Sequence, residues 1–161
     1  MTVHTVMASP IGDLRIVEQD GAITAIEFSP FVDSDGRPRG ARDDAHPVLR
    51  QAVQQLTEYF NRERQAFDLP LAPKGSDFQH SVWKELALIG FGETATYGQI
   101  AHRLGRTNAA SRAVGLANGS NPIPIVIPCH RVIGANGTLT GYAGGVERKQ
   151  ILLDLEQDAL F

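Results

Sequence analysis

The stretch that decides how this chain folds is residues 121–133, N-P-I-P-I-V-I-P-C-H-R-V-I, which holds the only cysteine, Cys129, directly before His130. Each of its three prolines fixes the backbone φ angle and removes an amide donor, so the isoleucines between them cannot lie in the middle of a sheet. We therefore expect a rigid, extended apolar wall that presents the thiol at the floor of a pocket. A cysteine beside a histidine is either reactive or simply buried, and the pair alone does not decide which.

The sequence before this stretch predicts a helix-turn-helix. Both S-D-F-Q at residues 76–79 and T-Y-G-Q at residues 96–99 fit the capping box, in which side chains and backbone amides satisfy each other at a helix start. The first should open an amphipathic helix, and the second a short helix that ends near Gly105. A turn at residues 106–108 and a helix at residues 109–118, rich in small side chains, complete the pattern.

The sequence after the cysteine predicts a loop and a closing helix. Residues 134–145 contain five glycines, too many for regular structure, and we expect a flexible flap over the Cys129 pocket. Apolar residues at helical spacing then predict a helix from about Glu147. Its buried residues should be Ile151, Leu152 and Leu155.

The first half predicts a small sheet with one helix. Alternating or clustered apolar residues indicate a three-stranded antiparallel meander, with strands at residues 3–6, 14–17 and 23–28. A helix covering this sheet should bury Leu49, Val53, Leu56 and Phe60. Between them, residues 29–45 are rich in charged residues, Gly and Pro, which favours a solvated loop.

These elements predict the α+β fold class. We expect an N-terminal α/β structural domain at residues 1–75, built from the small antiparallel sheet and its helix. We expect a mostly helical, winged-helix-like domain with the helix-turn-helix at residues 76–161. The boundary is placed in L-P-L-A-P-K-G, residues 69–75, which no regular element can include.

The charges are unevenly distributed. The net charge is −3, yet no Asp or Glu occurs from Thr94 to Val146, where the basic residues include Arg103, Arg106, Arg112 and Arg131. A local basic excess of this kind is the electrostatic footprint of a DNA-binding face, although an acid-free run can also arise by chance.

One cysteine excludes an internal disulfide and leaves too few thiols for a cysteine-based zinc site, so we expect no metal and no cofactor. The N-terminus lacks a charged segment followed by an apolar core, and no run approaches 18 apolar residues. We therefore expect a soluble cytoplasmic protein that does not enter a membrane.

The motif P-C-H-R-V after an N-P-x-x-I lead resembles the O6-alkylguanine-DNA alkyltransferases, the methylated-DNA to protein-cysteine methyltransferases. The resemblance is close over residues 77–156 and loose over residues 1–75. It implies irreversible, single-turnover transfer of an alkyl group from DNA to Cys129. It also implies that the partner is double-stranded DNA carrying O6-alkylguanine, and that O4-alkylthymine is repaired as well. The protein would act as a monomer, and whether it binds cooperatively along DNA is left open.

The resemblance assigns roles in the alkyl-transfer chemistry. Cys129 is the nucleophile, and His130 acts on it through a water while being oriented by Glu156 on the last helix. Asn121 bonds backbone near the site and holds the cysteine turn.

The resemblance also assigns contacts with the substrate. The target base would meet Tyr97, Pro124, Val132, Tyr142 and Ala143, with the carbonyls of Cys129 and Val132 accepting from its exocyclic amine. Arg112 would fill the space left by the flipped nucleotide, as the helix approaches the minor groove. The predicted DNA-contacting residues are Ala110, Ser111, Arg112, Ala113, Gly115 and Arg131.

Two other functions fit parts of the pattern. A binding-only damage sensor on the same fold would need no cysteine, so Cys129 argues against it. An unrelated Cys-His hydrolase would turn over an ester or amide and leave no stable adduct.

Overall fold

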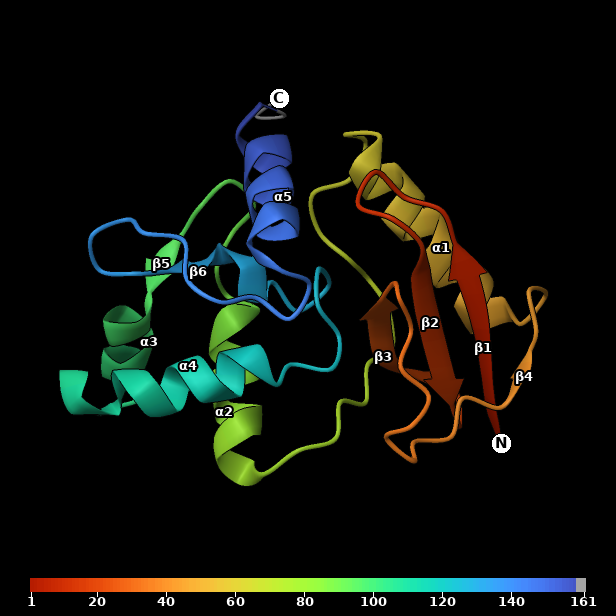
Figure 1. The fold of residues 1–161 in the computed structure, drawn as a ribbon, viewed down its shortest axis with the longest axis horizontal. Coiled ribbons are helices and arrows are strands. Elements are labelled where there is room, and N and C mark those ends of the chain that lie inside the picture. Colours follow the sequence, from red (N-terminus) through yellow and green to blue (C-terminus); the bar gives the residue numbers. More distant parts are fainter. Residues whose placement is uncertain (159–161) are drawn as a thin grey trace. The chain divides into compact units, whose positions relative to one another are not determined.

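The structure is a computed structural model that describes residues 1–158. The chain forms two compact units, Met1–Lys74 and a second that begins at Gly75. The first holds a small sheet with a helix and the second is mostly helical, which confirms the predicted α+β fold class (Figure 1). No helix within residues 1–158 is long and apolar enough to cross a membrane.

The first unit is built on a four-stranded sheet of order β3-β2-β1-β4. Strands β1 (Thr2–Met7), β2 (Leu14–Gln19) and β3 (Ala22–Phe28) pair antiparallel, which confirms the meander. The sheet is not purely antiparallel as predicted, because β4 (Ala41–Arg42) pairs parallel with the other edge of β1. This two-residue strand lies in the segment expected to be a solvated loop, and it is too short to give an alternating pattern.

Helix α1 (Pro47–Phe60) packs on β1, β2 and β3. Its buried face is rotated from the predicted one, because Val53 and Phe60 are only half-buried. The buried face instead includes a small alanine, Ala52, and a tyrosine, Tyr59, each one residue before the predicted position. The buried residues are Leu49, Ala52, Gln55, Leu56 and Tyr59.

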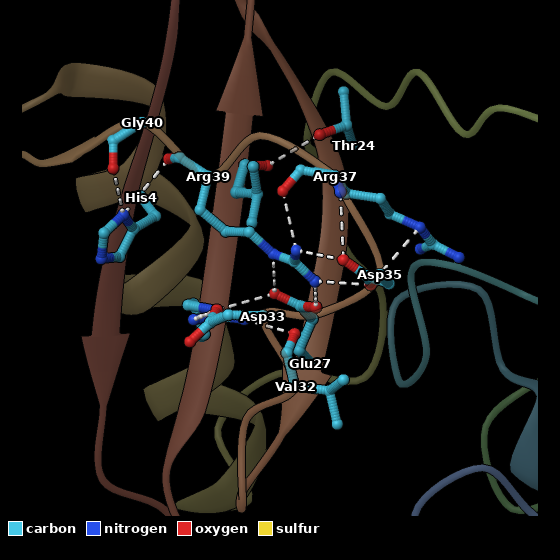
Figure 2. A network of polar contacts seen from close by, with 11 residues as sticks. His4, Thr24, Glu27, Val32, Asp33, Asp35, Arg37, Arg39 and Gly40 are labelled. Carbon is cyan, nitrogen blue, oxygen red and sulfur yellow. Dashed lines mark hydrogen bonds and ion pairs between the residues drawn. The ribbon is translucent and has the colours of Figure 1, made fainter.

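An ion-pair network orders part of the segment predicted to be a solvated loop (Figure 2). The Arg39 side chain is only 8% exposed, and its guanidinium donates to Glu27 of β3 and to Asp35. Burial would raise the pKa of Glu27, but bonds from Arg39 and Arg15 lower it instead. Adjacent strand residues point to opposite faces, so this network covers the face of β2 that carries Arg15.

In the second unit, α2 (Asp77–Leu86) and α3 (Tyr97–Arg103) each begin with a complete capping box, as predicted. A short 3₁₀ turn at Asn108–Ala110 leads into α4 (Ser111–Gly119), so the helix predicted from residue 109 begins two residues later. The Trp83 indole donates to the Ala117 carbonyl at 2.9 Å and ties α2 to α4.

Two short strands and a final helix complete the second unit. Strand β5 (Ala95–Thr96) pairs parallel with β6 (Val132–Ile133), which directly follows the cysteine motif. Residues 134–145 contain no helix or strand, as expected. Helix α5 (Val146–Asp158) does not bury Ile151, which is 42% exposed, and Leu155 is half-buried. Within residues 146–157 of this helix, the buried residues are Lys149, Leu152 and Glu156.

Candidate active site

The segment before Cys129 is buried and apolar but it is not extended. Its backbone bends through consecutive turns, with Ile127 donating to the Ile123 carbonyl at 3.0 Å and Ile125 at a φ of 74°. Cys129 then starts a 3₁₀ turn, Cys129–Arg131. The predicted extended wall is therefore wrong, because tight turns satisfy backbone groups that a sheet cannot use between prolines.

Asn121 holds these turns together through its buried amide. Its Nδ2 donates to the Ile127 carbonyl at 2.8 Å, and its Oδ1 accepts from the Ile123 amide at 3.0 Å. A further bond from Asn121 reaches the Cys129 side chain. One side chain thus fixes both the backbone around the thiol and the thiol itself.

His130 and Glu156 form the centre of a buried polar cluster. The His130 Nε2 lies 2.6 Å from Oε2 of Glu156, and both residues are at most 1% exposed. Burial would raise the pKa of Glu156, but the bonds from His130 and Arg131 hold that pKa at about 2. An ionised carboxylate only accepts, so the neutral imidazole carries its proton on Nε2. The Nδ1 of His130 is then an acceptor, and it has no hydrogen-bond partner within residues 1–158.

Arg131 belongs to the same cluster, which corrects its predicted role at the DNA surface. Its Nε and Nη2 donate to the two Glu156 oxygens at 2.8 and 3.0 Å, and Nη1 donates to the Ile89 carbonyl at 2.7 Å. The residue is 5% exposed. The Glu156 carboxylate neutralises the charge of this guanidinium, which is therefore not available to bind a DNA phosphate.

The Cys129 thiol is 3% exposed, and its surroundings act on it in two directions. Burial raises the pKa of Cys129 to about 11, against bonds from Asn121 and Tyr142 and the charge of Lys149, which lower it. Burial lowers the pKa of His130, because Glu156 offsets the desolvation of the imidazolium only in part. At neutral pH the pair is therefore a thiol beside a neutral imidazole.

Lys149 is a site residue that sequence reasoning missed. Its fully buried ammonium donates to the Val132 carbonyl at 2.6 Å and to the Thr140 carbonyl at 3.1 Å. It therefore holds the glycine-rich loop against β6, close to the thiol. The helical spacing could have marked Lys149 as buried, since residues 149, 152 and 156 share one face of α5.

Asn118 is a second residue that was missed. It lies near the end of α4, is 2% exposed, and donates from Nδ2 to the Cys129 carbonyl at 3.3 Å. An Asn just before a glycine at a helix end is common, so nothing in the sequence marked it.

The predicted DNA-contacting residues other than Arg131 lie on or just before α4. Arg112 and Ala113 are exposed, while Ala110 and Ser111 are half-buried where the 3₁₀ turn meets the helix. Gly115 is half-buried instead of open, because its Cα faces the Tyr97 ring, where a Cβ would stand 3.6 Å away.

A groove of about 500 Å³ runs between α4, Tyr97 and the glycine-rich loop. The Tyr97 hydroxyl lies 2.6 Å from the Thr140 hydroxyl, so this tyrosine also contacts the loop. Of the other predicted base contacts, Pro124 and Val132 are buried, whereas Ala143 is exposed in a loop turn. Tyr142 is half-buried, and its hydroxyl interacts with the thiol.

No cluster of three or more His, Cys, Asp or Glu side chains suited to a metal ion occurs within residues 1–158. The buried acid Glu156 is already neutralised by Arg131 and bonded by His130.

Two family models match this chain. The model described as 6-O-methylguanine DNA methyltransferase, ribonuclease-like domain, matches residues 2–73. The model described as 6-O-methylguanine DNA methyltransferase, DNA binding domain, matches residues 77–158.

Curated relatives and solved structures agree with these models. The methylated-DNA–protein-cysteine methyltransferase of Mycolicibacterium paratuberculosis is 48% identical, over 98% of this chain and 93% of the relative. The constitutive methylated-DNA–protein-cysteine methyltransferase of Bacillus subtilis is 44% identical, over 98% of this chain and 96% of the relative. The Mycobacterium tuberculosis O6-methylguanine methyltransferase structure is 44% identical and superposes with a TM-score of 0.91, covering 100% and 96%. The structure of M. tuberculosis OGT in complex with DNA is 43% identical and superposes with a TM-score of 0.85, covering 98% of this chain and 94% of that one.

Proposed function

We propose, because this chain belongs to the 6-O-methylguanine DNA methyltransferase family, that it repairs DNA by moving the alkyl group of O6-alkylguanine onto Sγ of Cys129. The observation that carries the proposal is the buried thiol beside a histidine that Glu156 orients at 2.6 Å. Cys129 is the only cysteine in the sequence, and the thioether that it forms is not reversed by thiols. The reaction is therefore stoichiometric.

The polar cluster supports removal of the thiol proton. Because Nε2 of His130 is bonded to Glu156, Nδ1 is the basic atom, and it accepts the proton through a bridging water or directly. The imidazolium that forms is stabilised by the Glu156 carboxylate. Lys149 adds a positive charge that favours the thiolate over the thiol.

The transfer is a displacement at the alkyl carbon. The thiolate forms the S–C bond as the C–O6 bond breaks, and the electron pair of that bond returns to the guanine. The thiol proton ends on N1 of guanine, which leaves an ordinary base. The product is a thioether, which no thiol can exchange, so the protein is consumed.

The base must leave the duplex, because its alkylated oxygen lies at the pairing edge. Arg112 is exposed near the start of α4, where it can occupy the space that the base vacates. O4-alkylthymine presents its alkylated oxygen at the same edge, so we include it as a second substrate. The reactive cluster comes from one chain, so a monomer suffices, and a reducing compartment such as the cytoplasm suits the free thiol.

The test is intact mass measurement after incubation with a duplex carrying one O6-methylguanine. We expect a gain of one methyl group, mapped to Cys129 by peptide analysis, and none for Cys129→Ser. Binding without a mass change would support a damage sensor, and multiple turnover with unmodified protein would support a hydrolase. Either result contradicts the proposal.

A further inference from the structure

Asn118 contains a buried acceptor with nothing to bond. Its side chain is 2% exposed, and Oδ1 has no hydrogen-bond partner within residues 1–158. The positions of the amide oxygen and nitrogen follow from the partner, since a carbonyl only accepts and the group facing the Cys129 carbonyl must be the donor Nδ2. Leaving an acceptor buried and unpaired is unfavourable, and such groups in native proteins call for an explanation.

The position of Oδ1 places it beside the Cys129 carbonyl. Nδ2 lies 3.3 Å from that carbonyl oxygen, and the amide bond lengths put Oδ1 about 2.2 Å from Nδ2. The two acceptors are therefore at most about 5.5 Å apart. An amino nitrogen that donates both hydrogens at ordinary lengths needs acceptors separated by about 5 Å.

The Val132 carbonyl is the other acceptor near the thiol, and it is already engaged. Lys149 donates to it at 2.6 Å, and a charged donor at that distance makes a strong bond. An incoming amino group therefore finds a freer acceptor in Asn118 Oδ1 than in Val132.

We propose that Asn118 is a specificity-determining residue whose Oδ1 accepts a hydrogen bond from the exocyclic 2-amino group of the flipped guanine, next to the Cys129 carbonyl. This inference rests on the proposed function and names how the same site recognises its base. A site that holds an unpaired acceptor for an amino group disfavours a base that lacks one. Asn118 also lies on α4, so the helix that carries Arg112 helps to read the base.

The experiment compares two duplexes that differ only in the 2-amino group, one with O6-methylguanine and one with O6-methylhypoxanthine. Single-turnover rates of methyl transfer are measured for the wild-type protein, Asn118→Leu and Asn118→Met. Leu has the same number and branching of side-chain heavy atoms as Asn, and Met fills an irregular gap if the Leu variant does not fold. Asn61→Met makes the same substitution at an exposed residue of the first unit and should leave both rates unchanged.

We expect the wild-type protein to prefer O6-methylguanine, and either Asn118 variant to lose about threefold to tenfold of that preference, as for loss of one hydrogen bond. Equal slowing of both substrates by the Asn118 variants would overturn the proposal, because the loss would then have nothing to do with the 2-amino group. If the wild-type protein forms no Cys129 adduct with either duplex, the proposed function itself fails.

Discussion

Glu156→Gln should destabilise the fold as well as slow alkyl transfer. The substitution keeps the shape of the side chain but removes the charge that neutralises Arg131, which is 5% exposed and then has only neutral oxygens, those of the Ile89 carbonyl and the new amide, as acceptors. Breaking a buried ion pair on one side costs roughly 3–5 kcal/mol, because it leaves an uncompensated charge. Domains of this size are stable by about 5–15 kcal/mol, so the loss is a large fraction of the total.

The assay is equilibrium unfolding in urea, with the free energy of unfolding compared between variants. Glu147→Gln on the same helix is the matched control, since Glu147 is exposed in the first turn of α5. That control should lose at most about 1 kcal/mol, from the helix dipole. Adding Arg131→Met to Glu156→Gln should restore much of the stability, because neither charge is then left alone.

Transfer should stay slow in the double variant, by roughly tenfold or more, because the His130 imidazolium formed during proton removal still lacks its carboxylate. The double variant thereby separates the effect of Glu156 on the free energy of unfolding from its effect on the rate of transfer. A loss below about 1 kcal/mol in Glu156→Gln, or a double variant less stable than either single one, would refute the assignment of Arg131 to an internal ion pair.

Three further outcomes follow from the same geometry. Lys149→Met should slow transfer at neutral pH and move the pH profile of the rate upward, because the charge that lowers the pKa of Cys129 is removed. Arg112→Ala should slow repair of subsaturating duplex but leave reaction with free O6-methylguanine base unchanged, since the free base needs no flipping. Acid should weaken the wild-type fold more than Glu156→Gln. The Glu156 pKa of about 2 lies below its ordinary value of 4.5, so its contribution is complete above the ordinary value and lost as pH falls through 2.

Each of these three outcomes has a result that would contradict it. For Lys149→Met, an unchanged pH profile would assign the lysine to loop anchoring alone. For Arg112→Ala, equal losses on duplex and free base would make the arginine structural. For the acid titration, parallel curves of unfolding free energy against pH would mean that Glu156 is not a carboxylate with a lowered pKa in the folded state.

The sequence predicted the local elements that have strong short-range signals. Both capping boxes lie where S-D-F-Q and T-Y-G-Q placed them, because the two reciprocal bonds need only four consecutive residues. The meander was also predictable, since its strands pair with their nearest neighbours in the chain. Strand β4 was not, because two residues give no period, and its pairing with β1 depends on a segment far along the chain.

The buried faces of helices were predicted less well, because apolar residues at helical spacing do not reveal which charged residues are also buried. In α5 the apolar pattern indicates Ile151, which is exposed, and gives no sign of Lys149 and Glu156, which are buried. Charged residues are almost never fully buried unless they are paired. Here the partners of Lys149 are 9 and 17 residues away, and the nearest partner of Glu156 in the polar cluster is 25 residues away. Sequence alone cannot supply such partners, and the role of Glu156 came only from the resemblance.

The phase of α5 explains why one helix can organise both ends of the cysteine turn. Lys149 and Glu156 are seven residues apart, so they share a face and stand about 10.5 Å from each other along the axis. The lysine reaches the Val132 carbonyl, just after the turn, while the carboxylate holds His130 within it. In the proposed proton transfer, a cation and an anion on one rigid element would thus favour the thiolate from one side and the imidazolium from the other. Both charged products of proton transfer are stabilised by groups that are already in place before the proton moves.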